Sequence, residues 1–234
     1  LKYYSQIFEI TEINSTFYKI PAQEIVRRWN EDTPRHFRFT AKFPSAITHE
    51  KRLDRVNSEV FSFLASLSSI HEKISALVLQ LPPSLSFEEA KPRLGELFDL
   101  LPDDFVYPIE GRHESWFSQD AITYLKQNKH CLVWNDVAGV NNPMPITSDY
   151  LYVRLIGDRS IPDLEFGKVS KNKKELIINW AQKLQEINDI PNAMVMANNH
   201  FKGFGPATAN SLRMHLGMRE LIWDEKKQKT LGSF

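Results

Sequence analysis

Two glutamates are the residues of this chain best suited to acid–base chemistry. Glu12 lies in FEITEINSTFYKIP, where an apolar run gives way to polar residues, and Glu110 lies in PIEGRHESW. A pair of carboxyl groups can act as general acid and general base when their surroundings separate their pKa values. A histidine and an aspartate that follow other apolar segments extend the set. The predicted catalytic residues are Glu12, His49, Glu110 and Asp136.

A second group of residues is suited to holding an anionic molecule. Arginine binds phosphate or carboxylate through two parallel hydrogen bonds, and lysine offers a compact positive charge. Amide side chains would orient the bound molecule. The predicted substrate-binding residues are Asn14, Lys42, Gln80, Arg112, Arg154 and Asn198. The alternative is a structural network in which the three cations only balance the three carboxylates of the first group.

A metal site is a third interpretation, which the spacing does not favour. Carboxylate and imidazole groups from different strands can hold zinc or manganese. The candidate ligands are Glu12, His49, Glu110, His113, Asp136 and His200. However, the sequence has no closely spaced ligand pair such as His-x-x-x-His or Cys-x-x-Cys. We therefore predict no metal ligands and leave the cofactor open.

The candidate residues share one position relative to the predicted strands. These strands cover residues 7–13, 37–42, 74–81, 105–110, 131–136, 150–156 and 193–198. Several are almost continuous apolar runs, which is typical of parallel strands covered on both faces. Almost every strand ends in a charged or amide group. Because functional residues of a (β/α) barrel lie at this end of its strands, we expect the candidates to gather at one mouth.

Amphipathic helices are predicted between these strands, over residues 22–31, 54–69, 119–128, 172–188 and 206–216, with a further helix after the capping box SFEE at 86–89. The alternation predicts one α/β domain over residues 1–234, a TIM-type (β/α) barrel. Seven strands are one fewer than eight, which fits a first strand missing from the N-terminus. A doubly wound open sheet is the alternative, but no glycine-rich dinucleotide turn follows any strand.

Six segments, in order, carry a resemblance to a known family. They are TEINSTFYKIP, FRFTAKFPSAITHEKR, LVLQLPPS, IEGRHESWF, YLYVRLIGD and MANNHFKGFGPATAN. These segments resemble the successive motifs of the domain of unknown function 72 family, the YecE-like proteins of bacteria and archaea. The resemblance implies a TIM-type barrel and no established reaction. The chain departs from the family in lacking its glycine-rich first strand and in having Ile156 where the family tends to have histidine.

Charge and cysteine content narrow the class of protein. The chain has 29 Lys plus Arg and 29 Asp plus Glu, so it lacks the positive excess of a general nucleic-acid binder. Its single cysteine, Cys131, lies in the apolar segment HCLVWND, where we expect a buried thiol. We therefore expect a cytoplasmic protein with no membrane segment, and we leave its oligomeric state open.

These observations favour an enzyme, a hydrolase or isomerase, that acts on a small anionic compound. Its substrate would be phosphorylated or sugar-like, and acid–base chemistry would occur at the mouth. That class rests on analogy between folds. The alternative is a non-catalytic module that binds a nucleotide or nucleic acid.

Overall fold

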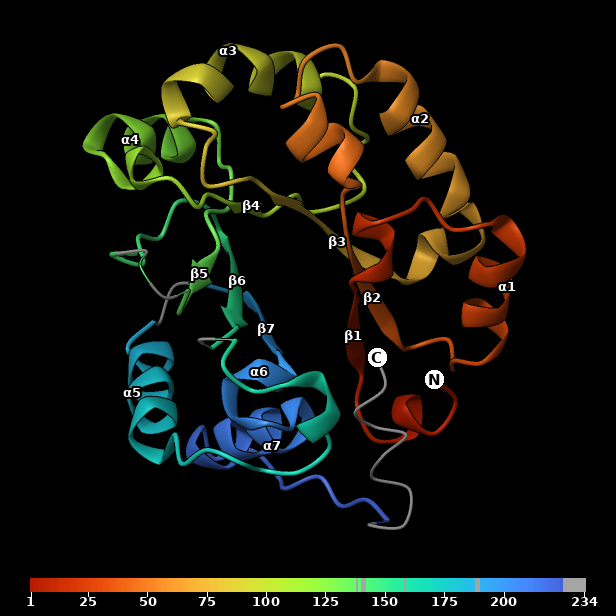
Figure 1. The fold of residues 1–234 in the computed structure, drawn as a ribbon, viewed down its shortest axis with the longest axis vertical. Coiled ribbons are helices and arrows are strands. Elements are labelled where there is room, and N and C mark those ends of the chain that lie inside the picture. The colour runs from red at the N-terminus through yellow and green to blue at the C-terminus, as the bar shows by residue number, and fades with distance from the viewer. Residues whose placement is uncertain (138, 140–141, 158, 188–189, 225–234) are drawn as a thin grey trace.

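The computed structural model describes residues 1–137, 139, 142–157, 159–187 and 190–224. Strands and helices alternate along most of the chain, except that β6 follows β5 and α7 follows α6 directly (Figure 1). The strands are β1 (Ile10–Ile13), β2 (Arg38–Lys42), β3 (Ile74–Gln80), β4 (Ile109–Glu110), β5 (Trp134–Asn135), β6 (Tyr150–Leu155) and β7 (Asn192–Ala197). The helices are α1 (Gln23–Glu31), α2 (Asn57–Ser66), α3 (Phe87–Phe98), α4 (Gln119–Gln127), α5 (Lys174–Gln185), α6 (Asn199–Lys202) and α7 (Gly205–His215).

Each predicted strand segment overlaps an observed strand, but β4 and β5 are shorter than expected. Pro108 has no N–H to donate, so the ladder of predicted strand 105–110 is interrupted. Upstream of it, Val106 forms only an isolated bridge with Ala76. The predicted helices are also present, and Ser86 caps α3 by accepting the backbone N–H of Glu89. The last residue of predicted helix 172–188 lies outside the described residues.

All strand pairings in the described residues are parallel and follow the order of the chain. One sheet has the order β1-β2-β3-β4 and a second has the order β5-β6-β7. A bridge between Ile109 and Leu132 connects the two sheets. The helices lie on the outer side of the strands, which together form an arc (Figure 1). No helix among the described residues has both the length and the apolar character needed to cross a membrane.

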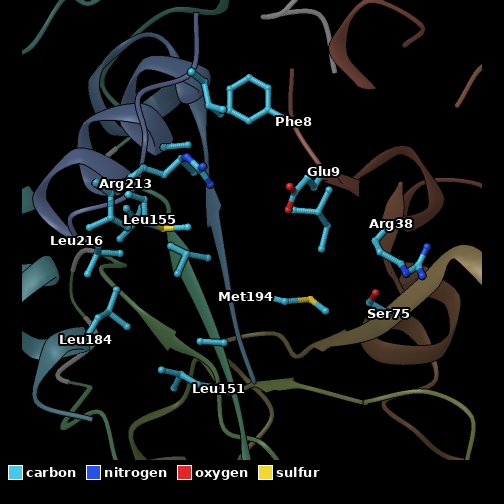
Figure 2. Close-up of a pocket in the computed structure, with 18 of the residues that line it drawn as sticks. Phe8, Glu9, Arg38, Ser75, Leu151, Leu155, Leu184, Met194, Arg213 and Leu216 are labelled. Carbon is cyan, nitrogen blue, oxygen red and sulfur yellow. The ribbon is translucent and has the colours of Figure 1, made fainter. Parts of the chain in front are cut away.

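The arc is open between β1 and β7. The described residues form no strand pairing between these two edges, so the fold is α/β with parallel sheets and the sheets do not close into a ring. A cavity of about 870 Å³ lies at the opening. Figure 2 shows Leu151, Leu155 and Met194 from the strands, together with Leu184 and Leu216 from the helical side, around this space.

Alternation along the strands decides which side chains face the inside of the arc. Val78, Cys131, Val133 and Tyr152 form one buried apolar cluster. Residues two positions further along a strand point to the same side, so the carboxyl ends of β3, β5 and β6 present polar groups inward. Cys131 is buried as expected, and burial raises the pKa of its thiol to about 12. A thiol with that pKa is not a nucleophile at neutral pH.

Candidate functional site

Arg154 at the end of β6 joins polar groups from three other strands. Its Nη2 donates to Glu12 Oε1 of β1 at 2.6 Å, and its Nη1 donates to Gln80 Oε1 of β3 at 3.3 Å. Nη1 also contacts Glu110 Oε2 of β4. We call the set Glu12, Gln80, Glu110, Arg112, Tyr152 and Arg154 the Arg154 cluster. This cluster confirms that the carboxyl ends of strands from both sheets meet in one place.

Glu110 is the most enclosed member of the Arg154 cluster. It has no exposed surface, and Arg112 donates to its Oε1 through Nε at 3.1 Å and Nη2 at 3.0 Å. Burial alone would raise the pKa of Glu110, but the charges of Arg154, Arg112 and Lys42 hold it below the ordinary value. An ionised carboxylate without exposed surface is better suited to anchoring two arginines than to exchanging protons with a ligand.

Glu12 differs from Glu110 because it also borders a cavity. Its Oε2 accepts a hydrogen bond from Tyr152 Oη at 2.9 Å, and that hydroxyl also lies 2.8 Å from Thr40 Oγ1. The cavity, of about 370 Å³, opens at the carboxyl ends of β1, β2, β6 and β7. We call it the mouth cavity; its polar lining includes Glu12, Asn14, Lys42, Arg154, Asn198 and His200. Of the two glutamates, only Glu12 reaches it.

Lys42 is a cation of the mouth cavity that has no carboxylate partner among the described residues. Among the described residues, no carboxylate oxygen lies within 4.0 Å of its Nζ. The Phe17 ring lies on one side of the ammonium, at 5.8 Å from Nζ to the ring centroid. Burial and the charge of Arg154 lower the pKa of Lys42 to about 8, although Glu12 and Glu110 oppose this shift. Both carboxylates are already bound by arginines, which explains why Lys42 remains unpaired.

Replacing Lys42 with methionine is expected to stabilise the fold by about 1–3 kcal/mol at neutral pH, because the variant buries no unpaired charge. The pKa of Lys42 is lower in the folded chain than its ordinary value of 10.5, so the unfolded chain binds more protons between pH 8 and 10.5. Wild-type stability should therefore rise across that window, and the advantage of the variant should disappear by its upper end. Urea unfolding at several pH values measures the free energy of unfolding of wild type and Lys42→Met. Lys126→Met, on the exposed face of α4, is the control.

The structure places three of the four predicted catalytic residues outside the mouth cavity: Glu110, described above, and also Asp136 and His49. Asp136 accepts backbone N–H groups from Ile156 at 2.5 Å and Gly157 at 3.1 Å, so it holds the loop after β6. Burial raises the pKa of Asp136. His49 Nδ1 lies 2.9 Å from Thr48 Oγ1, and burial, followed by the charges of Arg112 and Lys42, lowers the pKa of this imidazole. His49 is close to the cluster, but it does not line the cavity.

Two buried residues of the site were not predicted. Asn135 pairs in register with Arg154, and its Nδ2 has no hydrogen-bond partner among the described residues. Tyr152 bridges Glu12 and Thr40. The alternation Cys131, Val133, Asn135 along the strand would have identified Asn135. It places this asparagine, and not Asp136, on the face toward the inside of the arc.

The candidate metal ligands do not come together. Across the described ranges, no group of three or more His, Cys, Asp or Glu side chains is arranged to hold a metal ion. His113 Nδ1 accepts the backbone N–H of Ser115 at 3.2 Å and starts a short helical turn. His200 Nδ1 lies 3.2 Å from the Ile161 carbonyl oxygen, and its Nε2 lies 3.8 Å from Asp163.

Comparison with known proteins gives a family match over almost the whole chain. A family model described as "Protein of unknown function DUF72" matches residues 1–231. The chain is 37% identical over 119 residues to "UPF0759 protein YecE" of Escherichia coli (strain K12), covering 51% of this chain and 43% of that protein. It is 28% identical over 136 residues to "UPF0759 protein YunF" of Bacillus subtilis (strain 168), covering 54% and 48% respectively. The aligned part is thus less than half the length of each relative.

Solved structures share the fold. A DUF72 family protein from Enterococcus faecalis V583 superposes with a TM-score of 0.78 at 21% identity, covering 93% of each chain. A second, from Thermotoga maritima MSB8, gives a TM-score of 0.71 at 22% identity, covering 90% of this chain and 85% of that one. At this level of identity the likeness extends to the fold alone.

Proposed function

Since this chain belongs to the DUF72 family, whose description assigns no activity, we propose its function from the mouth cavity: it is an enzyme that acts on a small anionic compound by acid–base chemistry. The substrate is phosphorylated or sugar-like, and the reaction is a hydrolysis or an isomerisation. The fold in this proposal is a single TIM-type barrel domain over residues 1–234. The described residues contain seven parallel strands in chain order, with helices outside and polar groups at the carboxyl ends, and this arrangement supports that architecture.

The single observation that carries the proposal is the unbalanced charge at the mouth. Among the described residues, three cations (Lys42, Arg154 and Arg159) and two carboxylates (Glu12 and Asp163) line the cavity, while Asp136 is bound to backbone N–H groups elsewhere. The Nε of Arg154 is also buried without a hydrogen-bond partner among the described residues. A buried unused donor beside an excess cation is favourable for an anion.

Glu12 is the proton-transfer group in this proposal. It is the glutamate that lines the cavity, and its two oxygens are oriented by Arg154 and Tyr152. Glu110 holds Arg154 and Arg112 in place, and Gln80 supports the same arginine. Asn14 and Asn198 line the cavity and orient the substrate. His49 and Asp136 act on neighbouring loops rather than on the substrate.

Titration calorimetry with inorganic phosphate tests anion binding. We expect wild-type protein to bind phosphate and Lys42→Met to bind it about tenfold or more weakly, which corresponds to at least about 1.4 kcal/mol. Lys126→Met, on the outer face of α4, should bind like the wild type. Absence of phosphate binding at millimolar concentration would contradict the proposal. Affinity for an oligonucleotide that falls steeply with salt would instead favour the binding module.

Turnover of phosphorylated sugars tests the role of Glu12. For any compound in such a panel that wild-type protein converts, Glu12→Gln is expected to lower kcat by about 10²- to 10⁴-fold, the usual contribution of a general acid or base. A Glu12→Gln variant with unchanged kcat would exclude the acid–base role. Circular dichroism checks that the variant remains folded.

A further inference from the structure

Three properties of Lys42 bear on its chemistry. It lines the mouth cavity, it has no carboxylate within ion-pair distance among the described residues, and it lies beside a guanidinium group. Anchoring an anion requires a permanent charge, which Arg154 at the cavity wall provides and which a lysine beside that guanidinium provides less fully. An unpaired amine at the wall of a polar cavity is suited to nucleophilic attack on a bound molecule.

We propose that Lys42 is the nucleophile of the mouth cavity and forms a Schiff base with an aldehyde or ketone group of a small anionic compound. This inference rests on the proposed function and specifies its substrate class as a carbonyl compound that carries an anionic group. It also makes Lys42 a catalytic residue rather than only part of the binding site.

The surroundings of Lys42 keep its amine available. Glu110 is held by two arginines, and Glu12 is held by Arg154 and Tyr152, so neither carboxylate is free to fix the ammonium. The nearby guanidinium charges disfavour a third cation. With the pKa of Lys42 near 8, about a quarter of its amines are neutral at pH 7.5, against about one in a thousand for an ordinary lysine.

The covalent step needs no oxidant or further reactant. The neutral amine nitrogen attacks the carbonyl carbon, and the C=O π electrons move to the oxygen, which takes up a proton as the nitrogen loses one. The carbinolamine then takes a second proton on its oxygen and the C–O bond breaks. Water leaves, and the nitrogen lone pair forms the C=N bond. Glu12 lines the same cavity and can exchange these protons with the substrate oxygen.

A buried lysine elsewhere in the fold, Lys73, provides an internal control. Lys73 is also enclosed, but its Nζ donates to the carbonyl oxygens of Asn30 and Thr33, each at 2.8 Å, and to Thr33 Oγ1 at 3.1 Å. All three of its hydrogens are therefore used within the fold. Lys73 should not react with a carbonyl compound, although it is less exposed than Lys42.

Borohydride trapping tests the inference directly. Wild-type protein is incubated with glyceraldehyde 3-phosphate at pH 7.5, reduced with sodium borohydride, digested and analysed by peptide mass spectrometry. We expect labelling at Lys42 at least tenfold faster than at the exposed Lys126, none at Lys73, and suppression at Lys42 by excess inorganic phosphate. Lys42→Arg, which keeps the charge, should abolish the label at that position. Glyceraldehyde without phosphate should label Lys42 more slowly.

The outcomes separate the inference from the proposed function. If phosphate binds by calorimetry but Lys42 labels no faster than Lys126, the Schiff base is wrong and the anion site stands. If phosphate does not bind by calorimetry, the proposed anion-binding function is wrong, whatever the labelling of Lys42 shows. If Lys42 labels rapidly and phosphate neither binds nor protects it, the residue is a nucleophile for uncharged carbonyl compounds, and the anionic substrate class is wrong.

Discussion

Replacing Arg154 with methionine is expected to lower the free energy of unfolding by about 3–5 kcal/mol, the usual cost of breaking a buried ion pair from one side. Arg154 is the common partner of Glu12, Gln80 and Glu110. Without it, Glu110 keeps only Arg112 and still has no exposed surface. The loss should therefore arise from an ionised carboxylate that is buried without sufficient compensation.

Urea unfolding of wild type and Arg154→Met measures this loss. Arg28→Met is the matched control, since Arg28 pairs with Glu24 at 3.0 Å with both side chains mostly exposed, and we expect a change below about 0.5 kcal/mol. The deficit of Arg154→Met should shrink as the pH falls toward the ordinary pKa of glutamate, because a neutral Glu110 needs no cation. A loss under 1 kcal/mol, or one independent of pH, would show that the cluster does not hold the strand ends together.

Gly157→Ala is the second substitution with a large expected effect, a loss of about 2–4 kcal/mol. Gly157 has φ +77°, which an alanine adopts only with strain, and an added Cβ would lie 2.5 Å from the His200 carbonyl oxygen and 2.7 Å from Phe201 Cα. Both are backbone atoms and cannot move aside as a side-chain tip would. The substitution would also shift the backbone N–H that Asp136 accepts.

Gly95→Ala in α3 is the control for this prediction. Nothing lies within 4 Å of a Cβ added at Gly95, and an alanine favours the helix, so this variant should be more stable by about 0.5–1 kcal/mol. Thermal unfolding of the two variants should therefore shift in opposite directions. Equal stability of Gly157→Ala and wild type would mean that the loop after β6 tolerates displacement. The packing of that loop against α6 would then not position the mouth.

The order of the strands and helices could be predicted from the sequence because it depends on local periodicity. Residues 54–69 and 119–128 carry apolar side chains at helical spacing, and the helices α2 and α4 lie within these ranges. The strand ends could be identified in the same way, since polar residues stop each apolar run. Periodicity did not predict the short β4, where Pro108 interrupts the ladder, nor that the part of the chain the structure describes has no pairing between β1 and β7.

The amino-acid sequence by itself determined that Glu12, Lys42, Gln80, Glu110 and Arg154 would end neighbouring strands. Only the tertiary structure decided which charges pair. Arg154 and Glu12 are 142 positions apart, and their contact depends on how the whole arc of strands is curved. The same curvature left Lys42 without a carboxylate partner among the described residues, whereas alternation along β5 and its register with β6 put Asn135 rather than Asp136 beside Arg154. Local sequence patterns determine which residue types lie at the carboxyl ends of the strands. Which of these residues form ion pairs depends on the positions of all the charged groups there, and only the folded chain sets those positions.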